Sequence, residues 1–277
     1  MIKRTAGAAI RALLVAWLLV MPALLLPVAA DTAQMVAFLA IAAAVLTFVE
    51  YLGAMPSMLE FRHAPPFNRI RFALLYFTIF ALTQITRFPV DPGGLTGLTA
   101  DLGLAAGRLL DVPFSPVRLM MLHLPDTAPA ALRTELLTAV GLAFFLSVTG
   151  IAVFWTTARL LGWPVRKAAF NVWTNLPLFD PTAGGDVLYR LRRDGHVNVA
   201  LGCLVYFLIP AGLELANESG WQLSLITPLP RVIMLSAWAF LPAALVMRGI
   251  ALQRVAMLID EKRRRTYAQT DVLASVL

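Results

Sequence analysis

Six long apolar stretches constrain the fold of this 277-residue chain more than any other feature of its sequence. The hydrocarbon core of a bilayer is about 30 Å thick and a helix rises about 1.5 Å per residue, so a spanning helix needs about 20 mostly apolar residues. The stretches that meet or nearly meet this length are residues 10–30, 34–55, 72–86, 136–161, 197–215 and 232–247. We therefore predict an all-α, polytopic membrane helix bundle with about six transmembrane helices and interfacial amphipathic helices.

The composition excludes a soluble domain. Hydrophobic residues make up 59% of the chain and charged residues only 14%, whereas soluble domains have roughly 45–50% apolar and about 25% charged residues. The net charge of +7 in a membrane protein indicates orientation and contact with anionic lipid headgroups, so we expect the lipid bilayer as a partner and no nucleic acid.

The arrangement of arginines predicts the sidedness. Most of the 23 Lys and Arg residues fall before the first stretch, between the second and third, between the fourth and fifth, or after the sixth. Positive charge is retained on the cytoplasmic side, so we predict that both termini are cytoplasmic and that the protein lies in a bacterial inner (plasma) membrane. The first stretch is also compatible with a cleaved signal peptide, but its apolar run is longer than a usual signal core.

Two connections are long enough to carry structure of their own. We divide the chain into a six-span domain at 1–250, with an outer loop at 87–134 and an inner loop at 163–195, and a cytoplasmic basic amphipathic tail at 251–277. The outer loop predicts a helix along Leu98, Leu102, Ala105 and Leu109, then a short helix opened by Ser115 and Pro116. Asp126 or Thr127 is expected to cap the fourth span.

The inner loop and the tail are expected to contact the membrane surface. The inner loop combines aromatic, apolar and basic residues typical of the headgroup boundary, namely Arg166, Lys167, Phe170, Trp173, Leu176 and Phe179. Asp186 can cap a short basic helix after them. The tail carries Lys262, Arg263, Arg264 and Arg265, each worth about 1 kcal/mol beside an anionic leaflet. A stop-transfer anchor that only sets topology explains the same cluster.

Glu50 is the one carboxylate well inside a predicted span. A buried charge needs a partner, so we favour structural pairing with an arginine, either Arg71, Arg159 or Arg248, over a proton or substrate role. The same stretch carries small residues at helical spacing, which predict a seam for close helix packing; they are Ala33, Ala37, Ala40, Ala44 and Thr47.

The remaining polar candidates have ordinary structural explanations. Gln84 is expected to bond its own helix or a neighbour, and Glu214 is expected at the outer surface after Pro210 and Gly212 have loosened its helix. The arginines that flank the short third and sixth stretches are expected to extend to the headgroups; they are Arg71, Arg87, Arg231 and Arg248.

The sequence carries no recognisable catalytic or cofactor motif. The single cysteine, Cys203, forms no intrachain disulfide, and the three histidines do not pair across helices to hold a haem. We expect no metal or cofactor, although Asp180, Asp186, Asp194 and His196 lie close in sequence.

Three functions therefore stay open. The first is a non-enzymatic assembly, scaffold or accessory subunit, with a membrane protein partner or a second copy of itself. The second is a small transporter or channel that uses Glu50. The weakest is a lipid-modifying enzyme that uses Asp180, Asp186 and His196. The last two require polar groups that converge on a cavity, and such groups are few.

Overall fold

The structure, a computed structural model, consists of helices with no strand among the residues it describes. Those residues are 2–54, 57–124, 127–164, 171–180, 182, 184–219 and 225–276, with only the backbone described at 3, 173, 217, 218 and 270–276. The helices are α1 (Ile2–Leu25), α2 (Ala30–Leu52), α3 (Phe67–Arg87), α4 (Gly94–Leu110), α5 (Pro116–Met121), α6 (Ala130–Leu160), α7 (Val172–Asn175), α8 (Val187–Glu218) and α9 (Pro228–Val276). The predicted all-α class is confirmed.

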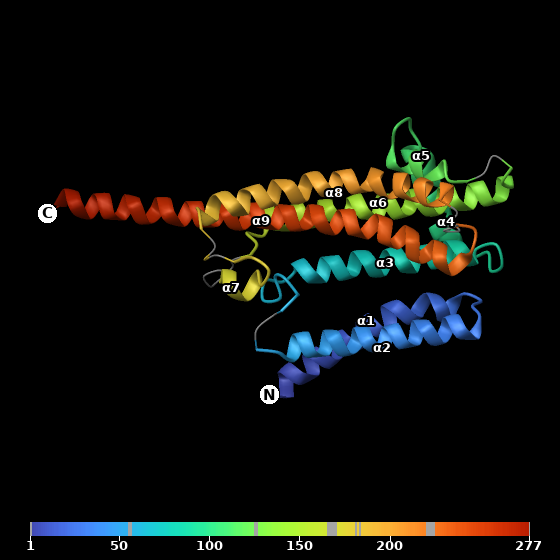
Figure 1. Ribbon diagram of the computed structural model, residues 1–277, viewed down its shortest axis with the longest axis horizontal. Coiled ribbons are helices and arrows are strands. Elements are labelled where there is room, and N and C mark those ends of the chain that lie inside the picture. The colour runs from blue at the N-terminus through green and yellow to red at the C-terminus, as the bar shows by residue number, and fades with distance from the viewer. Residues whose placement is uncertain are drawn as a thin grey trace.

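The six long helices run up and down one axis, as Figure 1 shows. Both termini, α7 and the connection from α2 to α3 lie at one end of the bundle, which we call the termini end. The short helices α4 and α5 lie at the opposite end, which we call the α4–α5 end. The two termini thus share an end, as an even number of passes requires.

Five helices are long and apolar enough to cross a membrane, namely α1, α2, α6, α8 and α9. The chain is therefore a multi-pass membrane protein. The third predicted span is α3, which does not belong to these five because Arg69, Arg71 and Arg87 leave it a short apolar middle. It still packs against α6 and α9. Its buried Thr78 and Thr83 donate to carbonyl oxygens one turn earlier in the helix, so they add no unpaired polar group.

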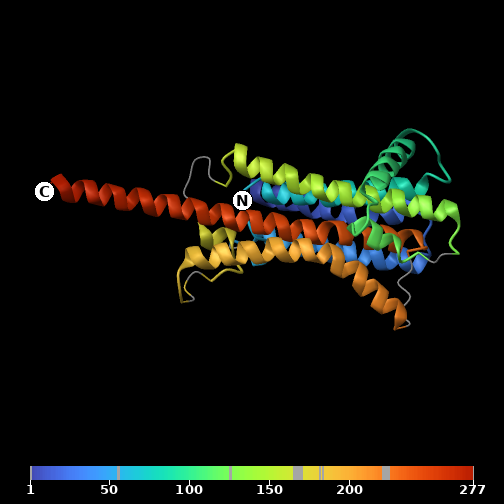
Figure 2. The same ribbon diagram turned by 90° about the horizontal axis from the view of Figure 1, so that it is seen from above.

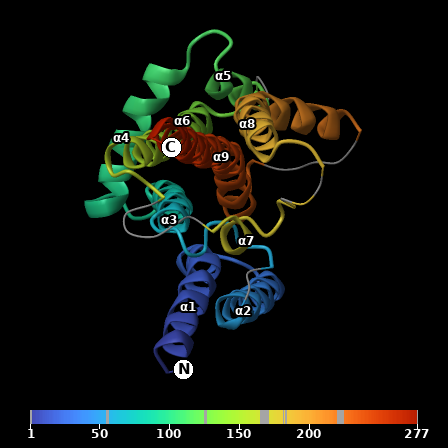
Figure 3. The ribbon, with the colours of Figure 1, turned by 90° about the vertical axis from the view of Figure 1, so that its left-hand side faces the viewer.

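Helices α1 and α2 form the tight hairpin that their short connection predicts. The hairpin lies to one side of the other helices (Figures 1 and 3). Of the small residues expected to form a seam, Ala40 is buried, Ala33, Ala44 and Thr47 are half-buried, and Ala37 is exposed. Most of α2 therefore faces outward with apolar side chains, as expected for a helix in lipid.

Glycines determine where the other helices approach most closely. A Cβ added at Gly249 of α9 would lie 2.6 Å from the carbonyl oxygen of Gly195 in α8, and one added at Gly202 would lie 2.8 Å from that of Pro242. Such contacts require small residues at helix interfaces. Helix α8 leaves this interface after Pro210, where its final segment turns away from the bundle (Figure 2).

Helix α4 crosses α6 at a second glycine contact. A Cβ added at Gly141 of α6 would lie 2.2 Å from the Cα of Gly107 in α4. The outer-loop helices that the sequence predicts are therefore present as α4 and α5, and the Ser115 side chain caps α5 as expected. The predicted leucine stripe of α4 is exposed, because its glycine and alanine face packs on α6; Leu98 and Leu102 are examples.

The caps of the longer helices agree with the sequence only in part. Asp186 caps α8, since its Oδ1 accepts from the Leu188 backbone amide at 3.2 Å. The basic segment after it continues directly into α8 instead of forming a separate short helix. Pro129, without a side-chain hydrogen bond, precedes α6 in place of the expected Thr127 cap. Asp126 lies outside the described residues.

Replacement of Gly141 by alanine tests the α4–α6 crossing. We expect Gly141→Ala to lower the free energy of unfolding by about 1–3 kcal/mol, because the added methyl group overpacks the contact. Gly212→Ala is the matched control, since no atom lies within 4 Å of its added Cβ and alanine favours a helix by up to about 1 kcal/mol. Thermal unfolding in detergent measures both, and equal midpoints for the two variants would contradict the crossing.

Candidate functional site

A buried carboxylate at the termini end, Glu60, lies at the centre of polar contacts that join several helices. Its residue is only 7% exposed, and it lies in the connection between α2 and α3. Its two oxygens accept from Arg248 of α9, Oε2 from Nε at 2.6 Å and Oε1 from Nη2 at 2.7 Å. This bidentate pair is the strongest geometry for an arginine and a carboxylate, and it ties the α2–α3 connection to the last span.

Neighbouring side chains extend this pair into what we call the Glu60 cluster, formed by Glu60, Asn68, Arg71, Asn198 and Arg248. Arg248 Nη1 donates to Asn198 Oδ1 of α8 at 3.0 Å, and Asn68 Nδ2 of α3 donates to the Glu60 carbonyl oxygen at 2.8 Å. The Arg71 guanidinium lies 5.3 Å from the ring centre of Phe67. The cluster therefore joins α3, α8 and α9 around one negative charge.

An aromatic group beneath the cluster holds the same connection in place. The rings of Phe61, Phe67, Phe154 and Trp163 are packed with centres 4.7–6.0 Å apart, a range typical of favourable aromatic pairs. Trp163 Nε1 donates to the Ala64 carbonyl oxygen at 2.9 Å. The chain between α2 and α3 is thus fixed both by charge and by packing.

Among the ionisable groups outside the spans, His63 and Asp186 have pKa values that differ from their ordinary ones. Partial burial, with the nearby Arg62 and Arg4 guanidinium groups, lowers the pKa of His63, so this imidazole is neutral at pH 7. Its Nε2 accepts from Arg62 Nε at 3.2 Å. The hydrogen bond from Arg263 and that from the Leu188 amide lower the pKa of Asp186, which stays ionised. Both shifts favour one charge state at pH 7, the neutral imidazole and the ionised carboxylate.

The prediction that Glu50 pairs with an arginine is wrong. Its carboxylate accepts from the backbone amides of Ser57, Met58 and Leu59 at 2.8–3.0 Å and from the Ser57 hydroxyl at 2.6 Å. Arg62 donates to its backbone carbonyl oxygen. The chain folds back after α2 and brings free amide groups to the carboxylate, so backbone donors satisfy it.

Three of the four arginines expected to extend to the headgroups are also placed differently. Arg231 is 3% exposed and pairs with Glu135 of α6. Arg248 is held by Glu60, and Arg71 lies between aromatic rings. Only Arg87 is at a surface, where it pairs with Asp91 at 3.0 Å. Carboxylates and aromatic rings inside the bundle bind these three arginines, so the arginines do not extend to the surface.

The other candidate residues lie apart from the Glu60 cluster. Gln84 is buried in α3. The Glu214 side chain is 58% exposed and lies 3.6 Å from Nε2 of His123, which contacts the Pro210 carbonyl oxygen at 2.7 Å. His123 thus connects the end of α5 to the bend of α8, a contact that the sequence analysis missed because the two residues are 87 positions apart.

The acidic residues of the inner loop and His196 do not come together at one site. Asp180 accepts from Thr182, Asp194 pairs with Arg193, and Asp186 pairs with Arg263. His196 is exposed on α8. The described residues contain no group of three metal-binding side chains. Four of the residues predicted for the inner loop lie outside the described part of the chain, namely Arg166, Lys167, Phe170 and the Trp173 side chain.

Comparison with family models, with curated proteins and with solved structures finds no match for the chain. Glu60 and Arg248 neutralise and bond each other, and Arg71 lies between aromatic rings, an arrangement that fixes helices in place. Catalysis and transport need polar groups aimed at an open cavity instead.

Removal of the Glu60 carboxylate tests whether the cluster holds the bundle together. We expect Glu60→Ala to destabilise the protein by about 2–4 kcal/mol, because the half-buried Arg248 is left without its counter-ion and its partial exposure reduces the cost. Replacement of both partners, Glu60→Leu with Arg248→Met, should recover part of this loss. Glu214→Ala, which removes an exposed carboxylate, is the control. Denaturation in detergent measures all three, and a Glu60→Ala variant as stable as the control would contradict the assignment.

Proposed function

We propose that this protein is a non-enzymatic membrane scaffold or accessory subunit that acts through contacts with a protein partner, and that α9 carries the contact. One observation supports this above the others. Helix α9 is 49 residues long and continues well past the rest of the bundle (Figure 1), where residues 261–269 are exposed. A helix without packing partners is only marginally stable in water, so a bound partner would supply the packing that it lacks.

The base of this projecting helix is tied to the bundle by ion pairs. Arg192 of α8 pairs with Asp260 at 2.9 Å, and Arg263 pairs with Asp186 at 2.9 Å. Arg264 and Arg265 have side chains that are each 80% exposed. These two arginines, with exposed Lys262, form a basic surface that fits an acidic face of a partner.

The direction of α9 favours a protein over a lipid headgroup as the occupant of this basic surface. Lys262 follows Arg248 by 14 residues on a continuous helix, a rise of about 21 Å. Because the tail continues along the bundle axis (Figure 1), it leads away from the bundle instead of lying flat at its edge. The alternative is that the basic surface of the tail binds anionic lipid headgroups.

The other functions have less support. A transport role for Glu50 requires a carboxylate free to bind a proton or a substrate, yet its oxygens already accept four hydrogen bonds. An enzymatic role requires Asp180, Asp186 and His196 to act on one substrate, and they bond to separate partners or face outward. We therefore place the function in surfaces instead of in a catalytic or transport cavity.

Charge reversal in the tail tests the proposed contact. We expect Arg264→Glu with Arg265→Glu to abolish recovery of a stoichiometric partner from native membranes, because it reverses the basic surface. Arg108→Glu, at the α4–α5 end, is the control and should leave recovery unchanged. If the charge-reversed variant loses binding to lipid vesicles but still recovers the protein partner, the basic surface binds lipid. A wild-type chain that is solitary in native membranes would refute the scaffold proposal.

The proposed location is a bacterial inner membrane with the termini end in the cytoplasm, as the arginine distribution favours. Single cysteines introduced into a Cys203→Ser background test it. We expect a membrane-impermeant thiol reagent to leave Arg190→Cys and Arg264→Cys unlabelled in intact cells and to label Arg108→Cys. Labelling of Arg190→Cys and Arg264→Cys from opposite sides would overturn the topology.

A further inference from the structure

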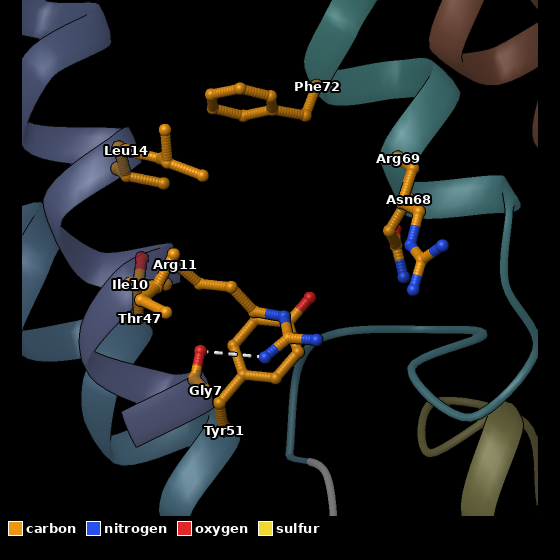
Figure 4. A pocket seen from close by; sticks show the side chains of 10 residues that line it. Gly7, Ile10, Arg11, Leu14, Thr47, Tyr51, Asn68, Arg69 and Phe72 are labelled. Atoms are coloured by element: carbon orange, nitrogen blue, oxygen red, sulfur yellow. Dashed lines mark hydrogen bonds between the residues drawn. The ribbon is translucent and has the colours of Figure 1, made fainter. Parts of the chain in front are cut away.

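A groove between the α1–α2 hairpin and α3 changes from polar to apolar along its length. Its polar part, named for Arg11, Tyr51, Asn68 and Arg69, is a pocket of about 450 Å³ at the termini end whose remaining walls are mostly apolar. Figure 4 shows Arg11 and Tyr51 on the hairpin side of this opening and Asn68 and Arg69 on the α3 side. No carboxylate is among the residues that line it.

The apolar part of the groove follows directly along the same two helices. It is a cleft of about 340 Å³ whose walls include Leu18 and Leu19 of α1, Leu75 and Ile79 of α3, and Phe240 of α9. Along α1 and α3, the residues that line the two cavities recur at intervals of three and four positions, so each of these helices contributes a single face. The two cavities therefore lie one after the other along the same faces of α1 and α3.

The arginines of the polar part keep their charge available. Arg11 donates to the Gly7 carbonyl oxygen at 2.7 Å and lies over the Tyr51 ring at 4.6 Å, and neither contact supplies a negative charge. Arg69 is exposed and forms no ion pair with the described residues. Two uncompensated guanidinium groups across one opening are complementary to a phosphate group.

The length of the groove fits one leaflet. Arg11 precedes Pro22, at the far end of the apolar cleft, by 11 residues of α1, a distance of about 16 Å and close to half of the roughly 30 Å hydrocarbon thickness. We infer that the groove binds one anionic phospholipid, with its phosphate between Arg11 and Arg69 and an acyl chain along the cleft. This lipid would fill the gap that separates the hairpin from the bundle.

Native mass spectrometry of the full chain with added phosphatidylglycerol tests the inference. We expect one retained lipid, and an affinity lowered about 30-fold in the double variant Arg11→Gln with Arg69→Gln, since two phosphate-binding charges are lost. The matched control, Arg108→Gln with Arg118→Gln, removes the same charge at the α4–α5 end and should bind as the wild type does. Both groove arginines are exposed, so the first variant should fold.

Two further measurements separate a lipid site from a simple phosphate site. Leu75→Trp fills the apolar cleft and should weaken lipid retention although both arginines remain, and glycerol phosphate, which lacks acyl chains, should not compete. Equal affinity of the double variant and the wild type would overturn the site. So would equal binding of phosphatidylcholine and phosphatidylglycerol, or full competition by glycerol phosphate. None of these outcomes bears on the tail contact proposed above.

Discussion

The absence of water inside a bilayer is the constraint on which this structure depends. A polar group there must find its partner within the chain, because an unsatisfied group costs several kcal/mol. The interior shows the result. Glu60 pairs with Arg248, Glu135 pairs with Arg231, and the Ser147 hydroxyl contacts that of Tyr206 while donating to the Ala239 carbonyl oxygen at 2.6 Å. Each contact joins segments that are distant in sequence, so the polar groups hold the bundle together both inside the spans and at their ends.

The same constraint separates the surfaces of the molecule into two kinds. Where polar groups are paired internally, the outward face is apolar and suited to lipid, as along α2. Exposed arginines lie on the α9 tail, where Arg264 and Arg265 pair with acids one turn earlier, and at the mouth of the α1–α3 groove, which no carboxylate lines. We propose an acidic protein surface as the partner of the first location and a phosphate with an acyl chain as the partner of the second.

Errors in the sequence-based expectations share one physical origin. The helical outer loop, the Ser115 cap and the extension of the last span are correct, because caps and apolar periodicity act within a few turns of one helix. Glu60 was missed because a glutamate in a connection reads as exposed, and Arg231 was expected at the surface because it flanks a short span. The partner that buries each is more than 90 residues away.

The sequence by itself determined that this chain is helical, that it crosses a membrane several times, and which stretches form its long helices. These properties depend on local sums of apolar residues compared with a bilayer of nearly constant thickness. Only the tertiary structure decided that Glu50 bonds to backbone amides, that Glu60 holds Arg248, and that α1 and α3 enclose a groove. Those outcomes depend on where helices cross, and glycines such as Gly141 act there through contacts that no single stretch of sequence contains.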